Sequence, residues 1–461
     1  MTFLGDRPFA APGVTFSLLV RTVKSLVPPG QSRLRKLVGA GGRAVVKARA
    51  RIRPHAAPYA EGFNDRTLVT SGVMIDSMPE GPGALRDRMP MPRGQEVSRP
   101  TLLRATEEED RALLDALLAS GSVRERHDRI DEQLAELVRC LSPHEALAGR
   151  RLERAVAEFT DGAELSHYGI WAWYPWSGRL VHVLPREEFR RVRTDRNRGK
   201  IAVAEQQRLL ARRIGIVGLS VGNSAALTCA MEGVAGSFRL ADFDTLGLSN
   251  LNRLRAGVHD LGLPKTVLCA RQMYEIDPYL DIELWNDGLT EDTVDAFFGA
   301  ADRPLDLVIE ECDTPWVKTA TREHARRHGV PVLMDTNDRG LLDVERFDLE
   351  PDRPLFHGRG GDLTAEEVRR LAPADALAYL LRICDESRLS PAMKDALGLI
   401  GHTLSSWPQL ASGVMLGGAL LTDAARRILL GAPVPSGRYY ADLEELVGPI
   451  DAERVLTGAA R

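Results

Sequence analysis

The sequence predicts an α/β fold built on a doubly wound, mainly parallel sheet, since short apolar runs alternate with helical stretches from Arg213 onward. The predicted strands are Ile214–Val217, Phe238–Ala241, Ile282–Trp285, Leu305–Ile309 and Val330–Met334. The helices predicted between them are Ser224–Val234, Lys265–Tyr274, Thr293–Phe298 and Pro315–His328. Helical crossovers of this kind join parallel strands and cover both faces of the sheet. In such Rossmann-like sheets, ligands bind beyond the carboxyl ends of the strands, where the strand order reverses.

Length and composition are those of an ordinary globular protein, with 461 residues, 44% hydrophobic and 27% charged. The net charge of −4 argues against a chain that coats nucleic acid. The five cysteines are at least forty residues apart, which excludes CxxC half-sites, so we expect neither zinc nor a disulfide framework. The longest nearly unbroken apolar stretch, Leu410–Leu421, is shorter than the roughly 20 residues that a membrane span needs. We therefore expect a buried helix there, no membrane span and a cytoplasmic location.

Charge and composition divide the chain into four parts. Residues 1–55 hold eleven Lys or Arg against one acid, Asp6, a net charge of +10 that leaves −14 for the rest. This basic region is either a solvated tail or an arm for RNA, an acidic lipid surface or an organelle address. The predicted parts are a basic disordered extension (1–60), a Pro- and Gly-rich linker (61–105), a small domain of helices and a β-hairpin (106–192), and an α/β domain (193–461) with its core at 213–355 and a closing helix and C-terminal segment at 400–461.

The small domain is predicted from two kinds of sequence pattern, one helical and one alternating. Helices are expected at Glu107–Leu118 and His127–Cys140, and a third is expected to start at Ser142-Pro143 and run through Val156. Two alternating runs on either side of Ser177-Gly178 then predict a β-hairpin. Three tryptophans of this hairpin could form a ligand platform, but covering a core is the favoured interpretation: Trp171, Trp173 and Trp176.

The ends of the first two predicted strands carry residues suited to a nucleotide. A turn from Gly218 to Gly222 follows the first strand, and the glycines allow the backbone to approach a phosphate at a helix N-terminus. The turn lacks a full GxGxxG pattern, so a plain tight turn is an equally good interpretation. Asp242 and Asp244 end the second strand, where a carboxylate can accept hydrogen bonds from ribose hydroxyls. These residues fit ATP and NAD equally well.

The next motifs favour a triphosphate. Asn250 and Arg253 stand in the run Ser-Asn-Leu-Asn-Arg, and Lys265 opens the following helix. Arginine can grip phosphate oxygens in a fork, and lysine adds a point charge. The run Glu310–Asp313 places carboxylates at the end of another strand. These acids could simply be solvated or cap the next helix, but beside a triphosphate they could also bind Mg²⁺, which is usually held by one or two carboxylates together with phosphates.

Together these motifs resemble the ThiF/MoeB superfamily, the adenylyltransferases related to ubiquitin-activating enzymes. The resemblance covers roughly Arg196–Phe347 and extends more loosely to Gly413–Gly431. Within the superfamily the chain is most similar to bacterial ThiF-like proteins, some of which are fused to a nitroreductase-like domain, although no such domain is expected within these residues. The resemblance implies that the chain uses ATP and Mg²⁺ to convert a carboxylate into an acyl-adenylate with release of pyrophosphate. It also implies a homodimer.

The resemblance assigns roles to individual residues. Asp242 would hold the ribose, Arg253 and Lys265 the phosphates, and Asp313 the Mg²⁺ ion. The implied nucleotide-binding set is Gly218, Gly222, Asp242, Asp244, Asn250, Arg253 and Lys265. The implied catalytic set is Arg253, Lys265, Asp313 and Arg198. Arg198 would enter the site from a partner subunit, but it is equally well interpreted as one of a run of surface cations.

The sequence also departs from the family pattern. Ser220 and Val221 occupy places where the family has glycines, which puts the approach of a phosphate in doubt. Glu310 stands where the family usually has Asp, and Lys318 where it has Arg. No cysteine suits a thioester nucleophile, since even Cys384 has acidic neighbours that would raise its pKa.

Three functions follow in order of preference. The first is an adenylyltransferase without its own thioester cysteine, acting on a small acid, a peptide C-terminus or a ubiquitin-like or carrier protein. The second is a nucleotide-binding pseudoenzyme or scaffold, and the third an NAD-dependent oxidoreductase. Nucleic acid is expected as a partner only through the basic arm. His324 and His328 have a metal-ligand spacing, but they lack the central Glu of a metalloprotease and flank two arginines, so an exposed helix face is predicted.

Overall fold

The computed structural model describes residues 97–299, 303–400 and 402–447. The basic stretch 1–60 and the first part of the predicted linker lie outside the described residues. All of the described residues belong to one compact unit. Among the described residues, no helix is long and apolar enough to cross a membrane.

The larger sheet of the described part has the predicted doubly wound order, β11-β10-β9-β8-β5-β6-β7. Strands β5 to β9 run parallel, while β10 and β11 add an antiparallel edge that the sequence did not predict. The strands are β5 (Arg213–Val217), β6 (Ser237–Ala241), β7 (Asp281–Trp285), β8 (Leu307–Glu310), β9 (Val332–Asp335), β10 (Leu341–Glu345) and β11 (Gly437–Tyr440). Strand order reverses between β5 and β8, so the ligand crevice of this fold lies at their carboxyl ends.

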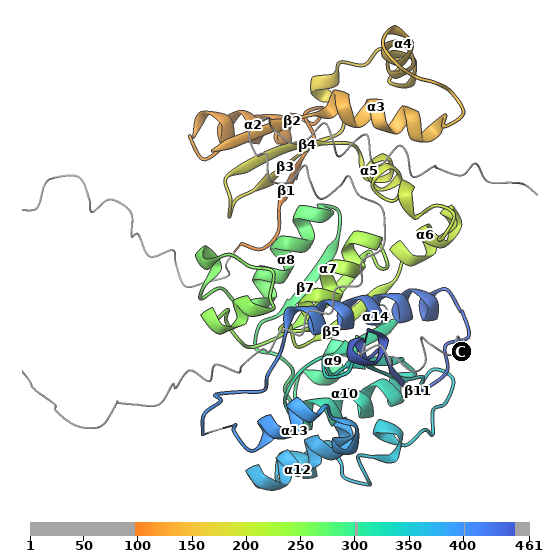
Figure 1. The fold of residues 1–461 in the computed structure, drawn as a ribbon. Coiled ribbons are helices and arrows are strands. Elements are labelled where there is room, and N and C mark those ends of the chain that lie inside the picture. The colour runs from red at the N-terminus through yellow and green to blue at the C-terminus, as the bar shows by residue number, and fades with distance from the viewer. Residues whose placement is uncertain (1–96, 300–302, 401, 448–461) are drawn as a thin grey trace, which may run out of the picture. The chain divides into compact units, whose positions relative to one another are not determined.

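Helices cover both faces of this sheet. Figure 1 shows α7, α8 and α14 on one side of β5 and α9 and α10 on the other, and the two sides hold separate apolar cores. These helices are α7 (Gly222–Glu232), α8 (Lys265–Ile276), α9 (Val294–Phe298), α10 (Pro315–His328) and α14 (Ala411–Leu429). The remaining C-terminal helices are α11 (Ala365–Arg369), α12 (Pro373–Cys384), α13 (Pro391–Leu397) and α15 (Leu443–Leu446). The predicted fold class is therefore confirmed.

Two glycines allow α14 to lie directly against α7 and β9. A Cβ atom on Gly418 would stand 2.4 Å from the Ser224 hydroxyl oxygen, and one on Gly417 would stand 2.2 Å from an Asp335 carboxylate oxygen. Neither contact is sterically possible, so the small residues are required for the close approach. The apolar stretch that begins at Leu410 is thus a packed helix, as predicted.

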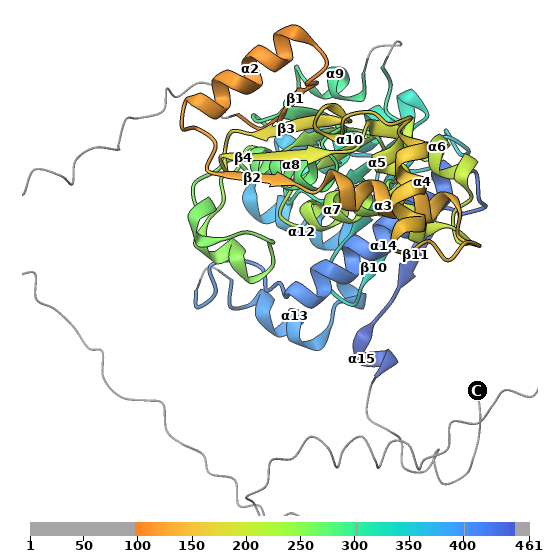
Figure 2. The same cartoon turned by 90° about the horizontal axis from the view of Figure 1, so that it is seen from above.

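A second, four-stranded sheet precedes the larger one, and Figure 2 shows its strands side by side in the order β1-β3-β4-β2. Its strands are β1 (Thr101–Leu103), β2 (Glu125–Asp128), β3 (Ile170–Tyr174) and β4 (Arg179–Val183). The helices of this part of the chain are α2 (Glu108–Ala119), α3 (Ile130–Leu141), α4 (Arg150–Phe159), α5 (Arg186–Arg193) and α6 (Val203–Leu210). The predicted hairpin is confirmed as β3 and β4. Trp171 and Trp173 are buried in its core, as the favoured interpretation expected.

Three local predictions were wrong. Strand β1 lies inside the stretch predicted as linker, so ordered structure begins before Thr106. Residues 125–128 are the edge strand β2 rather than the start of a helix, because pairing with β4 determines the conformation of this exposed, fully polar run. The helix expected from Ser142 begins only at Arg150, since Leu147 is buried in the preceding turn and Gly149 has a positive φ of 50°.

Short 3₁₀ segments connect several of these elements. They are η1 (Leu165–His167), η2 (Asp195–Asn197), η3 (Leu248–Asn252), η4 (Val258–Asp260), η5 (Leu355–Gly358) and η6 (Glu386–Arg388).

Candidate active site

A cavity of about 550 Å³ lies at the carboxyl edge of the parallel strands, at the point where the strand order reverses. The turns that follow β5, β6 and β8 line it, together with η3, the start of α8 and the loop before α14. Its lining includes most of the predicted site residues: Gly218, Asp242, Asp244, Asn250, Arg253, Lys265 and Asp313. The chain thus brings together residues that are up to 95 positions apart in the sequence.

The turn after β5 requires glycine at its first position. Gly218 has a φ of +84°, and a Cβ atom there would stand 2.6 Å from the backbone nitrogen of Cys312 in the turn after β8. Only glycine allows the two turns to approach so closely. Gly222 does not line the cavity, since it begins α7 and faces a methyl group of Ile216 instead. Its requirement for glycine comes from packing.

Of the two side chains that replace family glycines, only one faces the cavity. Val221 is buried in the core and does not line the cavity, so the expected narrowing by this residue was wrong. Ser220 does line the cavity, and its hydroxyl accepts a hydrogen bond of 3.2 Å from Nη2 of Arg253. The hydroxyl therefore orients the guanidinium.

Asp242 holds the glycine turn in place. Its two carboxylate oxygens accept hydrogen bonds from the backbone N–H groups of Leu219 (2.6 Å) and Asp244 (2.8 Å). Burial raises the pKa of Asp242, while Lys265 and these two donors act in the opposite direction. Since a carboxylate oxygen can accept a second hydrogen bond, contact with a ribose stays a prediction.

Lys265 supplies a buried cation to the cavity wall. The lysine side chain is 6% exposed, and its Nζ donates a 2.7 Å hydrogen bond to a carboxylate oxygen of Asp244, which is 53% exposed. The ammonium group is held at this position because Lys265 is the first residue of α8 and the Lys265 backbone N–H donates to the Asp244 carbonyl. With one exposed carboxylate as its partner, Lys265 can also donate to an anion in the cavity.

Arg253 follows η3, whose conformation is fixed by Asn250. The Asn250 side-chain oxygen accepts a hydrogen bond of 2.9 Å from the backbone N–H of Gly247. Arg253 donates to Asn252 and Ser220, but its buried Nε has no hydrogen-bond partner within the described part of the chain. Burial lowers the pKa of Arg253, and the neighbouring Asp313 carboxylate opposes this effect. The guanidinium therefore has donor capacity left for a ligand.

The acids after β8 have two different roles. Glu310 is fully buried and does not line the cavity; it pairs with Lys318 (3.1 Å) and Arg322 (2.8 Å). Burial alone would raise the pKa of Glu310, but these two cations lower it below its usual value. The two departures from the family pattern, Glu310 and Lys318, thus form an ion pair with each other. Asp313 is exposed and lines the cavity, which suits a Mg²⁺ ligand.

Sequence reasoning missed the loop at 404–410, all of whose residues line the cavity. Asn252 ties this loop to η3 through a 2.8 Å hydrogen bond from its side-chain nitrogen to the Gln409 carbonyl. Trp407 is the half-buried aromatic residue of the loop. In the sequence, the loop is marked only by a Trp-Pro pair in front of a long helix. This pair does not indicate that the loop lies beside strands more than 150 residues earlier.

Arg198 lies outside this cavity. It lines a separate cavity of about 80 Å³, and its Nη1 donates to an Asp195 carboxylate oxygen at 2.8 Å. Arg198 was predicted to act in the site of a partner subunit. A single chain does not test this role, so it stays a prediction.

No cysteine among the described residues has a lowered pKa. Burial raises the pKa of Cys229 and Cys269 to about 12, and it also raises the pKa of Cys140, Cys312 and Cys384. For Cys384 burial is the main cause, with acidic groups a minor one. The absence of a thioester nucleophile stays a prediction that these environments support.

Comparison with known proteins identifies part of the chain. Residues 194–337 match the ThiF family. An uncharacterized protein of Mycobacterium tuberculosis is 43% identical over 350 residues, which are 76% of this chain and 46% of that protein. The chain thus spans less than half of that relative. A molybdopterin-synthase adenylyltransferase of Haemophilus influenzae is 29% identical over 176 residues, 36% of this chain and 70% of that enzyme.

A solved structure also shares similarity with the chain. The E. coli tRNA N6-threonylcarbamoyladenosine dehydratase, crystallised with ATP, aligns with a TM-score of 0.38 and 17% identity, over 52% of this chain and 94% of that one. The ThiF-family segment contains every cavity residue named above except those of the loop at 404–410. The predicted relation to proteins fused to a nitroreductase-like domain stays a prediction.

Beside the cavity, two buried acids are expected to make stability depend on pH. The Glu311 carboxylate accepts a 2.7 Å hydrogen bond from the backbone N–H of Asp335, and Asp335 Oδ1 is buried without a partner among the described residues. Burial raises the pKa of Asp335 to about 7, and burial together with the Asp335 charge raises that of Glu311 well above its usual value.

Because these pKa values are higher in the folded chain, the folded state holds more protons than the unfolded state between about pH 4 and pH 7. The free energy of unfolding should therefore fall as pH rises through this interval, by about 1.4 kcal/mol per pH unit for each extra proton held. Urea unfolding of the wild type and of Asp335→Asn at pH 5 to 8 tests this, with the exposed Asp287→Asn as control. Equal pH slopes in wild type and Asp335→Asn would contradict it.

Proposed function

We propose that this chain adenylylates a carboxylate with ATP. The observation that carries the proposal is the placement of Arg253, Lys265 and Asp313 around one cavity, beside a glycine turn that packs closely against the turn after β8. The two cations can donate hydrogen bonds to the phosphates of a triphosphate, and the carboxylate can bind its Mg²⁺ ion. The cavity volume of about 550 Å³ is within the range of small-molecule sites, roughly 300–1,000 Å³.

In the proposed reaction, a carboxylate oxygen of the substrate forms a bond to the α-phosphorus of ATP. The bond from that phosphorus to the bridging oxygen of the β-phosphate breaks, and pyrophosphate leaves with the electron pair. Arg253 and Lys265 would stabilise the negative charge that develops on the phosphate oxygens. Asp313 would hold Mg²⁺, which when bound offsets phosphate charge. The product is an acyl-adenylate.

The proposed carboxylate donor is a small acid, a peptide C-terminus or the C-terminus of a ubiquitin-like or carrier protein. The named relative from Haemophilus influenzae is an adenylyltransferase, which supports this reaction class. We further propose that the chain forms a homodimer, with Arg198 entering the partner's site, and that it transfers the acyl group without a thioester of its own. The raised pKa values of its described cysteines support the last point.

A second candidate function is a nucleotide-binding scaffold that performs no chemistry. The observation in its favour is Ser220, whose side chain lies in the cavity and occupies one donor of Arg253. A scaffold binds ATP or AMP, yet no carboxylate would make it exchange pyrophosphate into ATP.

Calorimetric titration with Mg-ATP tests the proposal, and we expect the wild type to bind. Lys265→Ala should weaken binding roughly 10- to 100-fold through loss of a charge-assisted hydrogen bond to phosphate. Because Asp244 is half exposed, it remains hydrated and the variant should fold. Lys200→Ala, which removes an exposed lysine outside the cavity, is the matched control.

Pyrophosphate exchange into ATP, screened over carboxylates, then separates the enzyme from the scaffold. The proposal is contradicted if the folded wild type binds no Mg-ATP. It is also contradicted if Lys265→Ala binds Mg-ATP as tightly as the wild type does. Binding of NADH instead would favour an oxidoreductase.

A further inference from the structure

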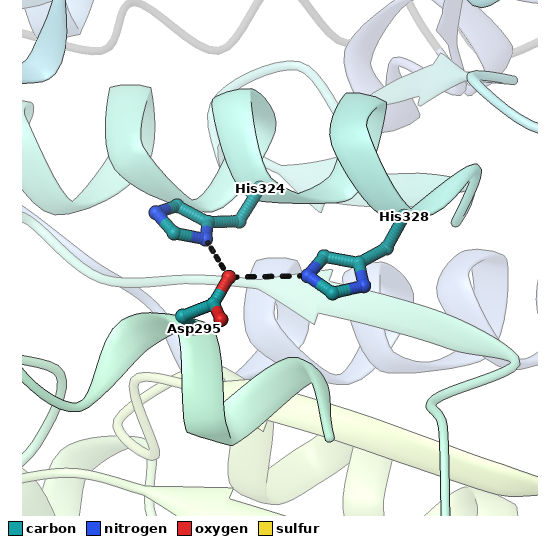
Figure 3. A group of neighbouring side chains, drawn as sticks. All are labelled: Asp295, His324 and His328. Atoms are coloured by element: carbon teal, nitrogen blue, oxygen red, sulfur yellow. Dashed lines mark hydrogen bonds and ion pairs between the residues drawn. The ribbon is translucent and has the colours of Figure 1, made fainter. Parts of the chain in front are cut away.

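Three potential metal ligands converge on the face of the sheet covered by α9 and α10. Asp295 comes from α9, and His324 and His328 come from α10 (Figure 3). Their ligand atoms all lie within 4.8 Å of one another. The histidine pair is one helical turn apart, so both rings project from the same face of α10. The prediction of an exposed helix face was wrong for the two histidine side chains, which are only 13% and 29% exposed. Asp295 lies 29 positions before His324, so no local pattern connected it to the pair.

Two of the three distances between ligand atoms are close to those around a tetrahedral ion. Asp295 Oδ1 is 3.0 Å from Nδ1 of His324 and 3.2 Å from Nε2 of His328. In a four-coordinate Zn²⁺ site with bonds of about 2.0–2.1 Å, adjacent ligand atoms are about 3.3 Å apart. The three side chains therefore need only small movements to surround an ion. Imidazole and carboxylate are also ligands that first-row transition metals accept.

The two rings are held in place by packing. Phe298 of α9 stacks on the ring of His328 at 5.5 Å and on the ring of His324 at 6.0 Å between centroids. The His324 side chain is 13% exposed and that of His328 is 29% exposed. Such fixed rings lose little conformational freedom on binding an ion, which favours binding. The 63% exposed Asp295 leaves room for water as a further ligand.

Arg327 places a positive charge at the same point. Nη1 of Arg327 lies 3.3 Å from Asp295 Oδ1 and competes with a cation for that oxygen. Its side chain is 63% exposed, so the guanidinium can turn into solvent when an ion binds. Arg327 therefore reduces affinity without closing the site.

We propose that Asp295, His324 and His328 bind a divalent transition-metal ion such as Zn²⁺, with water completing the coordination. The site is separate from the candidate active site, because α10 contributes Val317 near its start to the cavity and its last turns to the metal ligands. A metal there links α9 to α10 and stabilises the fold. This inference does not depend on the proposed adenylylation.

Zn²⁺ binding by the full chain, after treatment with a chelator, tests the site by calorimetry. We expect His328→Ala and Asp295→Asn each to weaken binding at least about tenfold, since each removes a ligand of the ion. His144→Ala is the matched control, because its exposed imidazole lies 3.8 Å from a single carboxylate of Glu145. Zn²⁺ should also raise the melting temperature of the wild type and of His144→Ala, more than that of the two site variants.

Co²⁺ provides a second readout, because its absorption spectrum reports coordination by nitrogen and oxygen ligands in the wild type. If His328→Ala proves unfolded by circular dichroism, Asp295→Asn still tests the site, since Asp295 is exposed. The proposal is overturned if the wild type binds no Zn²⁺, or if both site variants bind it as tightly as His144→Ala does.

Discussion

Replacing Arg253 with alanine is expected to lower the rate of pyrophosphate exchange into ATP by about 10²–10³-fold, the cost of losing one preorganised donor to the transition state. Ser220 and Asn252 hold the guanidinium beside the glycine turn, while its buried Nε has no partner among the described residues. Its position is thus fixed before a phosphate arrives. The negative charge that develops on the phosphate oxygens would then be stabilised by a donor that is already in position.

Arg255→Ala is the matched control, because this neighbouring arginine is exposed and does not line the cavity. Arg253→Lys should recover only part of the rate, since an ammonium cannot grip two phosphate oxygens in a fork. The test is to measure the steady-state exchange rate and the Mg-ATP affinity of each of the three variants. An Arg253→Ala variant as active as Arg255→Ala would contradict the proposed role.

The parallel part of the fold was predictable because each of its parts leaves a local signal. Strands β5 and β6 are apolar runs ended by Gly218 and by Asp242, and the helices after them have their own periodicity. Since parallel strands present their carboxyl ends at one edge, residues placed at those ends had to meet around one crevice. The prediction of a common site for Arg253 and Asp313 followed from this rule, and both line the cavity.

Features that depend on contacts between distant segments were not predictable. The acids after β8 look alike in the sequence, yet Glu310 is buried against Lys318 whereas Asp313 faces the cavity. The loop that carries Trp407 reaches the cavity through Asn252, which is far away along the chain. In the same way, strand β2 exists because β4 pairs with it. Such burial and pairing arise from tertiary structure, which no local period encodes.

Replacing Arg322 with methionine is expected to lower the free energy of unfolding by about 3–5 kcal/mol, the usual cost of leaving a buried ion without its partner. The Arg322 side chain is fully buried, pairs with Glu310 at 2.8 Å and with Glu345, and lies over the Phe356 ring at 4.0 Å. Methionine keeps much of the packing but leaves the Glu345 carboxylate, among the described residues, with only the backbone N–H of Phe356 as a donor.

Urea unfolding followed by circular dichroism measures the loss. Arg129→Met, which breaks an ion pair exposed by 73% and 64%, should cause little change and serves as the control. Adding Glu345→Gln to Arg322→Met should restore part of the stability, since it removes the uncompensated charge. A loss no larger than that of Arg129→Met would show that the buried pairs do not hold the fold.

The same variant connects this buried network to the candidate active site. Glu310 pairs with Arg322 and also accepts a 2.9 Å hydrogen bond from the backbone N–H of Cys312, in the turn that carries Asp313. Without Arg322, Glu310 loses one of the two cationic partners that the described part of the chain gives it and keeps Lys318, so the turn should be held less firmly. Mg-ATP affinity of Arg322→Met should therefore fall even at temperatures where the variant is fully folded, whereas Arg129→Met should bind as the wild type does. Unchanged affinity in folded Arg322→Met would mean that the network supports stability alone, and that Glu310 does not position the turn.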